Sequence, residues 1–331
     1  MKRRHYYWIL ATKFILSGAL VWMVLHRVPL VGVLENLKQA DRWWIALACV
    51  LTAGSVLLSA SRWWLLAAGL IRWRQALKYT MIGLFYGSVL PGGVSGDVAK
   101  GAALALKSPS TRAVGLPVSI VMDRLIGFAA LGVVFNLSCL ALASGMISAL
   151  PASLHSFSII AFLTSALALG AFGLAVSPRG LAWFDLRLKN FPPSRLQTLL
   201  DRVAAPLRAY GGQPIILAWA FLIGLGIHLI NVAAYVVLAH ALGVSLDMIG
   251  ATSLYAITSV IVMVPISISG LGLRDWFTVL FFEALGLSAD TGVAFAWLGL
   301  AVNLMIGLVG GIVQITEVFG PREQPYDQTN R

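Results

Sequence analysis

The chain has 331 residues, of which 59% are hydrophobic and 11% are charged. Soluble domains carry about 25% charged residues, so the composition excludes a soluble enzyme and predicts an all-α polytopic membrane protein. The net charge of +11 is explained by membrane topology and anionic lipid, without nucleic acid. Cys49 and Cys139 both lie in apolar runs, which excludes a disulfide framework and a cysteine metal site.

Six apolar runs are long enough to cross a hydrocarbon core of about 30 Å as helices. The first follows Lys2-Arg3-Arg4, as a signal peptide would, but no small-residue cleavage site follows it. We therefore expect an uncleaved first helix. The six predicted spans are Trp8–Leu25, Trp43–Ser61, Leu116–Leu142, Phe157–Val176, Ile215–Leu242 and Thr291–Ile315.

Two further apolar regions, 79–106 and 251–286, are interrupted by proline and glycine. Pro91 and Pro265 cannot continue a helix ladder, and the neighbouring glycines permit unusual backbone angles. Each half of the first region is about 10 to 12 residues, so it rises roughly 15 to 18 Å, about half of the bilayer core. We predict two re-entrant hairpins that break near the midplane, where irregular backbone must be buried in protein or line a wet cavity.

The distribution of Lys and Arg predicts that both chain termini lie in the cytoplasm. In this topology the basic residues, Arg62 included, fall mainly in cytoplasmic segments, and the two hairpins enter from opposite sides. The exceptions are Arg27, Lys38 and Arg42 outside, and Lys13, Arg124 and Arg274 within apolar segments.

The two breaks share a short pattern, Pro91-x-x-x-Ser95-Gly96 and Pro265-x-x-x-Ser269-Gly270. Together with the opposite entry sides, it predicts an inverted repeat about an axis in the membrane plane, a symmetry typical of transporters with a midplane site. A chance match of so short a pattern is the alternative.

The predicted organisation has four parts. Residues 1–176 form the first membrane half and 177–213 a basic cytoplasmic connector. Residues 214–316 form the second membrane half and 317–331 a disordered cytoplasmic tail. Within the connector, Arg195 to Tyr210 has an apolar stripe that suits a helix lying on an anionic leaflet or a solvated connector helix. Pro29 to Ala40 is predicted to be a similar interfacial segment on the outer side of the membrane.

Charged residues inside the bilayer need a partner or a function. Asp97 and Lys100 share one face of the returning half-helix, and Asp123-Arg124 lies about ten residues into its span. Adjacent helix residues point about 100° apart, so we expect neither Asp123-Arg124 nor Arg274-Asp275 to pair with itself. The candidate substrate-binding residues are Ser95, Gly96, Asp97, Lys100, Asp123, Arg124, Ser269, Gly270, Arg274 and Asp275.

Several of the polar groups in the apolar segments also have a purely structural interpretation. Asp97 is also placed to cap its half-helix, and Asp123-Arg124 to form structural ion pairs with other groups. His228, Asn231 and Tyr235 form a helical stripe that we expect to satisfy helix contacts rather than to bind a ligand.

The broken helices and the cations together predict an anion site. Helix N-termini offer free N–H groups and a positive dipole end, and Lys100, Arg124 and Arg274 add donors suited to phosphate. A phosphorylated lipid headgroup fits such a site, and so does a small soluble anion. The sequence has no Walker loop, no histidine pair at helical spacing and no G-x-S-x-G elbow, so we expect no cofactor, no metal and no enzymatic activity.

Several motifs carry a resemblance to a known family. Leu90-Pro91-Gly92-…-Gly96-Asp97-…-Lys100, Asp123-Arg124-…-Gly127 and Pro265-…-Gly270-Leu271-Gly272-…-Arg274-Asp275 resemble the flippase-like transmembrane family related to the membrane half of lysylphosphatidylglycerol synthase. The resemblance covers about residues 8 to 316. Lys100 stands where Arg is frequent in that family and Asp275 where Glu is common, which keeps the charge and changes the reach.

In the larger synthases of that family, a cytosolic domain makes aminoacylated lipid and the membrane half is thought to flip it. The resemblance therefore implies a stand-alone lipid flippase without the synthase domain, in the inner (cytoplasmic) membrane. Its expected partners are a phospholipid or polyprenyl-phosphate lipid and an anionic membrane surface, with homo-oligomerisation left open and no nucleic acid. The alternatives are an accessory protein that recruits a lipid or glycan synthase, and an enzyme that uses polyprenyl-phosphate sugars.

Overall fold

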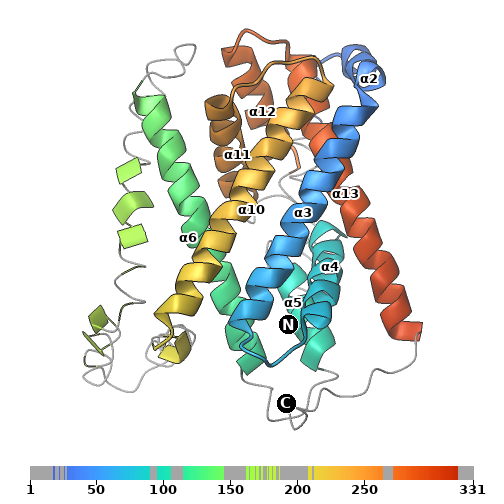
Figure 1. Cartoon of the computed structure of the whole chain (residues 1–331). Helices are drawn as coiled ribbons and strands as arrows, with labels where there is room; N and C mark the ends of the chain where they lie inside the picture. Colours follow the sequence, from blue (N-terminus) through green and yellow to red (C-terminus); the bar gives the residue numbers. More distant parts are fainter. Residues whose placement is uncertain are drawn as a thin grey trace, which may run out of the picture.

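The structure is a computed structural model that describes residues 28–89, 95–105, 115–144, 212–263 and 271–319, with residues 208–210 and scattered residues between 18 and 26 and between 162 and 186. Four long helices run through it: α3 (Arg42–Leu66), α6 (Gly115–Ala143), α10 (Pro214–Ala241) and α13 (Ala289–Phe319) (Figure 1). All four are long and apolar enough to cross a membrane.

These four helices confirm four of the predicted spans to within a few residues. The other two predicted spans, Trp8–Leu25 and Phe157–Val176, lie largely outside the described residues. The number of six spans and the cytoplasmic placement of both termini therefore stay predictions.

Each interrupted apolar region contains two short helices. The first region holds α4 (Trp73–Val89) and α5 (Ser95–Ala105), and the second holds α11 (Met248–Met263) and α12 (Leu273–Ala284). Figure 1 shows α4 and α5 in the lower half of the bundle and α11 and α12 in the upper half. The connecting residues 90–94 and 264–270 lie outside the described residues, so the re-entrant path and the inverted repeat stay predictions.

Glycines allow the short helices to pack backbone against backbone. A Cβ atom at Gly96 of α5 would collide with the carbonyl oxygen of Gly83 in α4. On the other side of α4, a Cβ atom at Gly310 of α13 would collide with the carbonyl oxygen of Met81. Such close approach is the usual way for helices to associate where apolar burial from water gives little driving force.

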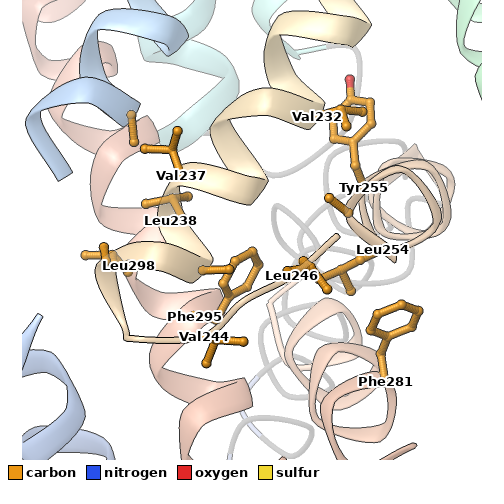
Figure 2. Close-up of a cluster of buried hydrophobic side chains, with 14 of the residues drawn as sticks. Val232, Val237, Leu238, Val244, Leu246, Leu254, Tyr255, Phe281, Phe295 and Leu298 are labelled. Atoms are coloured by element: carbon orange, nitrogen blue, oxygen red, sulfur yellow. The ribbon is translucent and has the colours of Figure 1, made fainter. Parts of the chain in front are cut away.

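Two clusters of buried apolar side chains stabilise the two ends of the bundle. One joins the end of α3 to α4, α5 and the start of α6 around Trp63, which is fully buried. The other joins α10 to α11, α12 and α13 (Figure 2). In the second cluster Phe295 packs against Tyr235 with 5.3 Å between ring centroids and against Phe282 with 5.2 Å.

The predicted short helix over Pro29–Ala40 is present as α2 (Leu30–Gln39). Its Asn36 amide donates to Asp290 Oδ2 at 3.2 Å in the first turn of α13, which ties α2 to the beginning of that helix. Of the predicted Arg195–Tyr210 helix, only 208–210 are described. The buried Tyr210 hydroxyl donates to the carbonyl of Leu66 at the end of α3.

We predict that Gly310→Ala lowers the unfolding temperature of the purified protein, because the added methyl group must displace the α4 backbone at Met81. Overpacking of this kind costs about 1 to 3 kcal/mol. Gly54→Ala in α3 is the matched control, since nothing lies within 4 Å of a Cβ atom there. We expect Gly54→Ala to leave the unfolding temperature unchanged or to raise it, and equal losses for the two variants would contradict the packing of α13 on α4.

Candidate functional site: a polar cavity between the short helices

A cavity of about 610 Å³ lies among the helices α3 to α6 and α10 to α13, all of which contribute to its wall. Its charged lining residues are Asp97, Lys100, Asp123, Arg124 and Arg274. Uncharged hydrogen-bonding groups cover much of the remaining wall: Thr52, Ser55, Ser59, Thr80, Ser88, Asn231, Tyr235, Thr258, Ser259 and Asn303. The cavity therefore brings charged residues of the first interrupted region together with Arg274 of the second.

The cavity lies at mid-height of the long helices. Ser55, Ile227 and Asn303 all line it, and each lies at or next to the middle of its helix, α3, α10 or α13. At 1.5 Å per residue, the two ends of α3 are roughly 16 to 20 Å from that level. A polar space at this depth is costly in hydrocarbon unless it holds water or a ligand.

The first group of charges comes from α5 and α6. Arg124 Nε lies 2.7 Å from Asp97 Oδ2, and both side chains remain partly exposed to the cavity. The ammonium of Lys100, a residue that is 5% exposed, lies 3.5 Å from the centre of the Trp63 ring. Among the described residues no carboxylate lies within ion-pair distance of Lys100. This end of the cavity therefore has an ammonium without a direct acidic partner.

A second ion pair lies beside the first and was not predicted. Arg62 Nε donates to Asp123 Oδ1 at 2.8 Å, and both residues are buried. The predicted end of the span at Ser61 is wrong, because α3 continues through Arg62 to Leu66. Arg62 is therefore a buried helix residue and not part of a connecting loop. Asp123 therefore has a structural partner, as the structural interpretation of this residue proposed.

The third group of charges is at the start of α12, where the structure corrects another prediction. Arg274 Nη2 pairs with Oδ1 of its neighbour Asp275 at 2.9 Å. The expectation that these residues would not pair with each other is wrong, because both Nε and Nη2 of the long Arg274 side chain reach the adjacent carboxylate. The other carboxylate oxygen of Asp275 accepts the backbone N–H of Gly272 at 3.1 Å, which satisfies a free donor at the helix start.

The cavity wall also contains apolar side chains. Val262 of α11 and Leu304 of α13 both line the cavity, yet they are 37% and 39% exposed. Among the described residues, no group of three His, Cys, Asp or Glu side chains is placed to hold a metal ion.

Comparison with known protein families identifies the family of this chain. Residues 10–311 match the family described as lysylphosphatidylglycerol synthase TM region. The chain belongs to this family. No curated protein shows a significant match to the chain. Membership supports a membrane protein related to lipid chemistry and confirms the resemblance drawn from the sequence.

The structure gives a physical reason for one of the motifs on which the sequence resemblance was drawn. In Asp123-Arg124-…-Gly127, the first residue pairs with Arg62 and the second with Asp97. A Cβ atom at Gly127 would lie 3.1 Å from a guanidinium nitrogen of Arg62, and one at Gly224 of α10 would lie 3.2 Å from the other. The two glycines leave the space that the Arg62 guanidinium occupies between α6 and α10.

The predicted site residues are only partly brought together. Gly96, Asp97, Lys100, Asp123, Arg124 and Arg274 line the cavity, whereas Ser95 and Asp275 are not among its lining residues. Ser269 and Gly270 lie outside the described residues. Asp275 is 2% exposed and acts on the cavity through Arg274.

The sequence analysis assigned only a packing role to His228, Asn231 and Tyr235, and two of these residues line the cavity. His228 Nδ1 lies 2.7 Å from the Tyr255 hydroxyl and Tyr235 lies 3.2 Å from Thr258 Oγ1, so the predicted contacts between helices are confirmed. Asn231 and Tyr235 also line the cavity. Asn303 was not singled out, although an asparagine in the middle of an apolar span is a signal that would have identified it.

We predict that Asp123→Leu destabilises the protein more than the double substitution Arg62→Met/Asp123→Leu. Removal of one partner leaves a buried charge uncompensated, which costs about 3 to 5 kcal/mol, whereas replacement of both partners by apolar groups is close to neutral. Unfolding temperatures of the parent, both single variants and the double variant in the same detergent would measure this. A double variant as unstable as the sum of the single ones would contradict the pairing.

Proposed function

We propose that the protein moves a phosphate-bearing lipid headgroup across the inner membrane through the mid-height cavity, with the acyl chains remaining in the bilayer. One observation carries the proposal: a polar, cation-lined cavity at mid-height whose wall also includes the exposed apolar side chains of Val262 and Leu304. Membership of a membrane family named for a lipid synthase supports a lipid substrate.

Lys100, Arg124 and Arg274 hold the phosphate in this proposal. Each lines the cavity, and guanidinium and ammonium groups bind phosphate oxygens through charge-assisted hydrogen bonds. Arg62 has a different role. Its guanidinium is held between Gly127 and Gly224 against Asp123, so it orients Asp123 and adds positive potential from outside the cavity wall.

Asp97 acts as the counter-ion of the empty site. Its carboxylate oxygen Oδ2 forms an ion pair with Arg124 Nε at 2.7 Å. A phosphate that enters the cavity competes with this carboxylate for the same guanidinium. The Lys100 ammonium, packed on Trp63, then provides positive charge that no described carboxylate neutralises directly. An empty cavity with one carboxylate fewer than it has cations would favour an anion over a cation.

The two ends of the cavity suggest how the headgroup moves. Lys100 and Arg124 belong to α5 and α6, whereas Arg274 opens α12 in the other half of the bundle (Figure 1). In this proposal the two pairs of short helices are re-entrant parts of an inverted repeat. Rocking of one repeat against the other would present the phosphate first to one cation group and then to the other. No covalent chemistry is needed for this movement, so we propose a transporter and not an enzyme.

We predict that Arg124→Gln and Arg274→Gln each slow the movement of a fluorescent phosphate-bearing lipid between the leaflets of reconstituted vesicles by tenfold or more. Loss of one charge-assisted hydrogen bond to phosphate weakens binding by about 1.5 to 3 kcal/mol, and 1.4 kcal/mol corresponds to a factor of about ten. Accessibility of the label to a membrane-impermeant quencher over time measures the movement.

Lys38→Gln is the matched control for these variants, because it also removes one cation but from the exposed last turn of α2. We expect its rate to equal that of the parent protein. Equal rates for all three variants would refute the phosphate site, and absence of movement by the parent protein would refute lipid transport itself. Movement of inorganic phosphate without lipid would instead favour a soluble anion as substrate.

We further predict that Asp97→Asn tightens the binding of a short-chain phosphate-bearing lipid several-fold. The amide no longer neutralises Arg124, so the phosphate meets a guanidinium that has lost its competing carboxylate. Binding measured by the lipid-dependent rise in unfolding temperature should thus change in opposite directions for Asp97→Asn and Arg124→Gln. Weaker binding by both variants would show that Asp97 contacts the headgroup directly.

A further inference from the structure

Trp63 of α3 is in direct contact with a cation of the cavity, although it does not itself line the cavity. The ammonium nitrogen of Lys100 lies 3.5 Å from the centroid of the indole ring. Both residues are buried, with exposed fractions of 0% for Trp63 and 5% for Lys100. A cation at this distance from a desolvated tryptophan face makes a strong cation–π contact. The indole is therefore a partner of the ammonium and not only a part of the apolar core.

Hydrogen bonds to α6 fix the orientation of the indole ring. Its Nε1–H donates to Ser119 Oγ at 3.1 Å, and the Ser119 hydroxyl donates to the carbonyl of Leu116 at 2.8 Å. Ser119 is fully buried, so both hydrogen bonds are shielded from solvent. Trp63 also belongs to the apolar cluster that contains Leu104 and Leu116. The ring is therefore held in place by the protein, and the flexible lysine is the partner that can move.

The other two cations that line the cavity are compensated in a different way. Arg124 pairs with Asp97 and Arg274 pairs with Asp275, so an incoming anion must compete with a carboxylate for each guanidinium. An indole face attracts an ammonium but carries no net charge. Lys100 therefore keeps its charge available to a ligand, although it is almost completely buried.

We propose that Trp63 is a positioning residue of the phosphate site. Its ring face holds the Lys100 ammonium in the charged form at the cavity wall, where it binds the phosphate without first releasing a carboxylate. The inference rests on the proposed function in so far as it takes an anion as the ligand. It adds to the site a residue that touches no ligand and acts only through Lys100.

The position of Asp97 shows what the indole prevents. Asp97 precedes Lys100 by three residues in α5, and side chains at this spacing are neighbours on a helix surface. Asp123 lines the same cavity. Without the indole face, the long lysine side chain would turn toward one of these carboxylates, because a buried ammonium without a partner carries a large desolvation penalty. Its charge would then be neutralised, and the phosphate would bind less tightly.

The test replaces Trp63 by tryptophans with increasing numbers of ring fluorines. Fluorine withdraws electron density from the ring face, so the cation–π contact weakens while the shape of the ring and its N–H group are kept. Binding of a short-chain diacylglycerol phosphate is measured on the purified full-length protein from the rise in unfolding temperature at several lipid concentrations.

We expect the affinity to fall stepwise along the fluorinated series, by about fivefold or more for the most fluorinated ring. A desolvated cation–π contact corresponds to a factor of about ten or more in an equilibrium constant, and fluorination removes most of it. An affinity that stays constant or rises along the series would overturn the inference.

Trp64 is the matched control position, because it is the next residue of α3, is 41% exposed and does not line the cavity. The same fluorinated series at this position should leave the affinity at the parent value. An equal fall at both positions would show that fluorination does not act through the contact with Lys100, and would also overturn the inference.

Lys100→Met shows whether Trp63 acts through the ammonium. Methionine keeps an unbranched apolar side chain and removes the charge, so the affinity should be lower and depend on Arg124 and Arg274. In this background the fluorinated series at Trp63 should have no further effect. A further stepwise loss would assign a purely structural role to Trp63 and overturn the inference. If Lys100→Met does not fold, Lys100→Gln is used in its place.

Each variant is also measured with inorganic phosphate, which separates failure of this inference from failure of the proposed function. If the parent protein binds neither probe, the phosphate site is wrong and the inference fails with it. If it binds inorganic phosphate but not the lipid, lipid transport is contradicted, and the series with inorganic phosphate decides on Trp63. If the lipid binds and fluorination has no effect, the proposed function stands and only the role of Trp63 is overturned.

Discussion

Compensation of charge among apolar helices is the constraint on which the rest of this structure depends. The pair Arg62–Asp123 is buried between three long helices, and the space for it exists because Gly127 and Gly224 have no side chains there. Asp97 compensates Arg124, and Asp275 compensates Arg274. Without these partners each charge would carry a desolvation penalty of several kcal/mol, and the helices would not pack around a polar centre.

The same pairing distinguishes structural charges from those available to a ligand. Arg62 is enclosed by glycine backbones and its carboxylate partner, whereas Arg124, Arg274 and Lys100 line an open cavity. Lys100 is stabilised by the face of Trp63, which leaves its charge without a direct acidic neighbour among the described residues. A cavity with such an excess of donors suits an anion, and the apolar side chains of Val262 and Leu304 in its wall suit an anion attached to apolar chains.

Hydrophobicity alone predicted the four long helices of the described part of the chain, because runs of about 20 apolar residues have few alternatives to a helix in a membrane. The charges within apolar segments also identified Asp97, Lys100, Arg124 and Arg274 as residues that line a cavity. Arg62 was missed because Ser61-Arg62-Trp63-Trp64 has the composition of a membrane boundary, and because its partner lies 61 residues away. Which acid meets which base depends on tertiary packing, and the sequence does not encode it in any short pattern.

The pairing of Arg274 with Asp275 shows the same limit at short range. The angle between neighbouring helix positions argued against it, but a flexible arginine reaches the adjacent carboxylate once that carboxylate is fixed on the N–H of Gly272. Likewise Asn231 and Tyr235 make the contacts between helices that the sequence predicted and line the cavity as well. A single polar side chain at a helix interface serves both purposes when the interface borders a wet space.

The most direct test of the central claim is an experimental structure of the protein in a lipid nanodisc that contains a phosphate lipid with an electron-dense phosphorothioate headgroup. We expect headgroup density inside the cavity, in contact with Lys100 and Arg124 or with Arg274, and acyl chains that lie against Val262 and Leu304. A cavity filled by protein side chains, or headgroup density confined to the outer surface of the bundle, would contradict this claim.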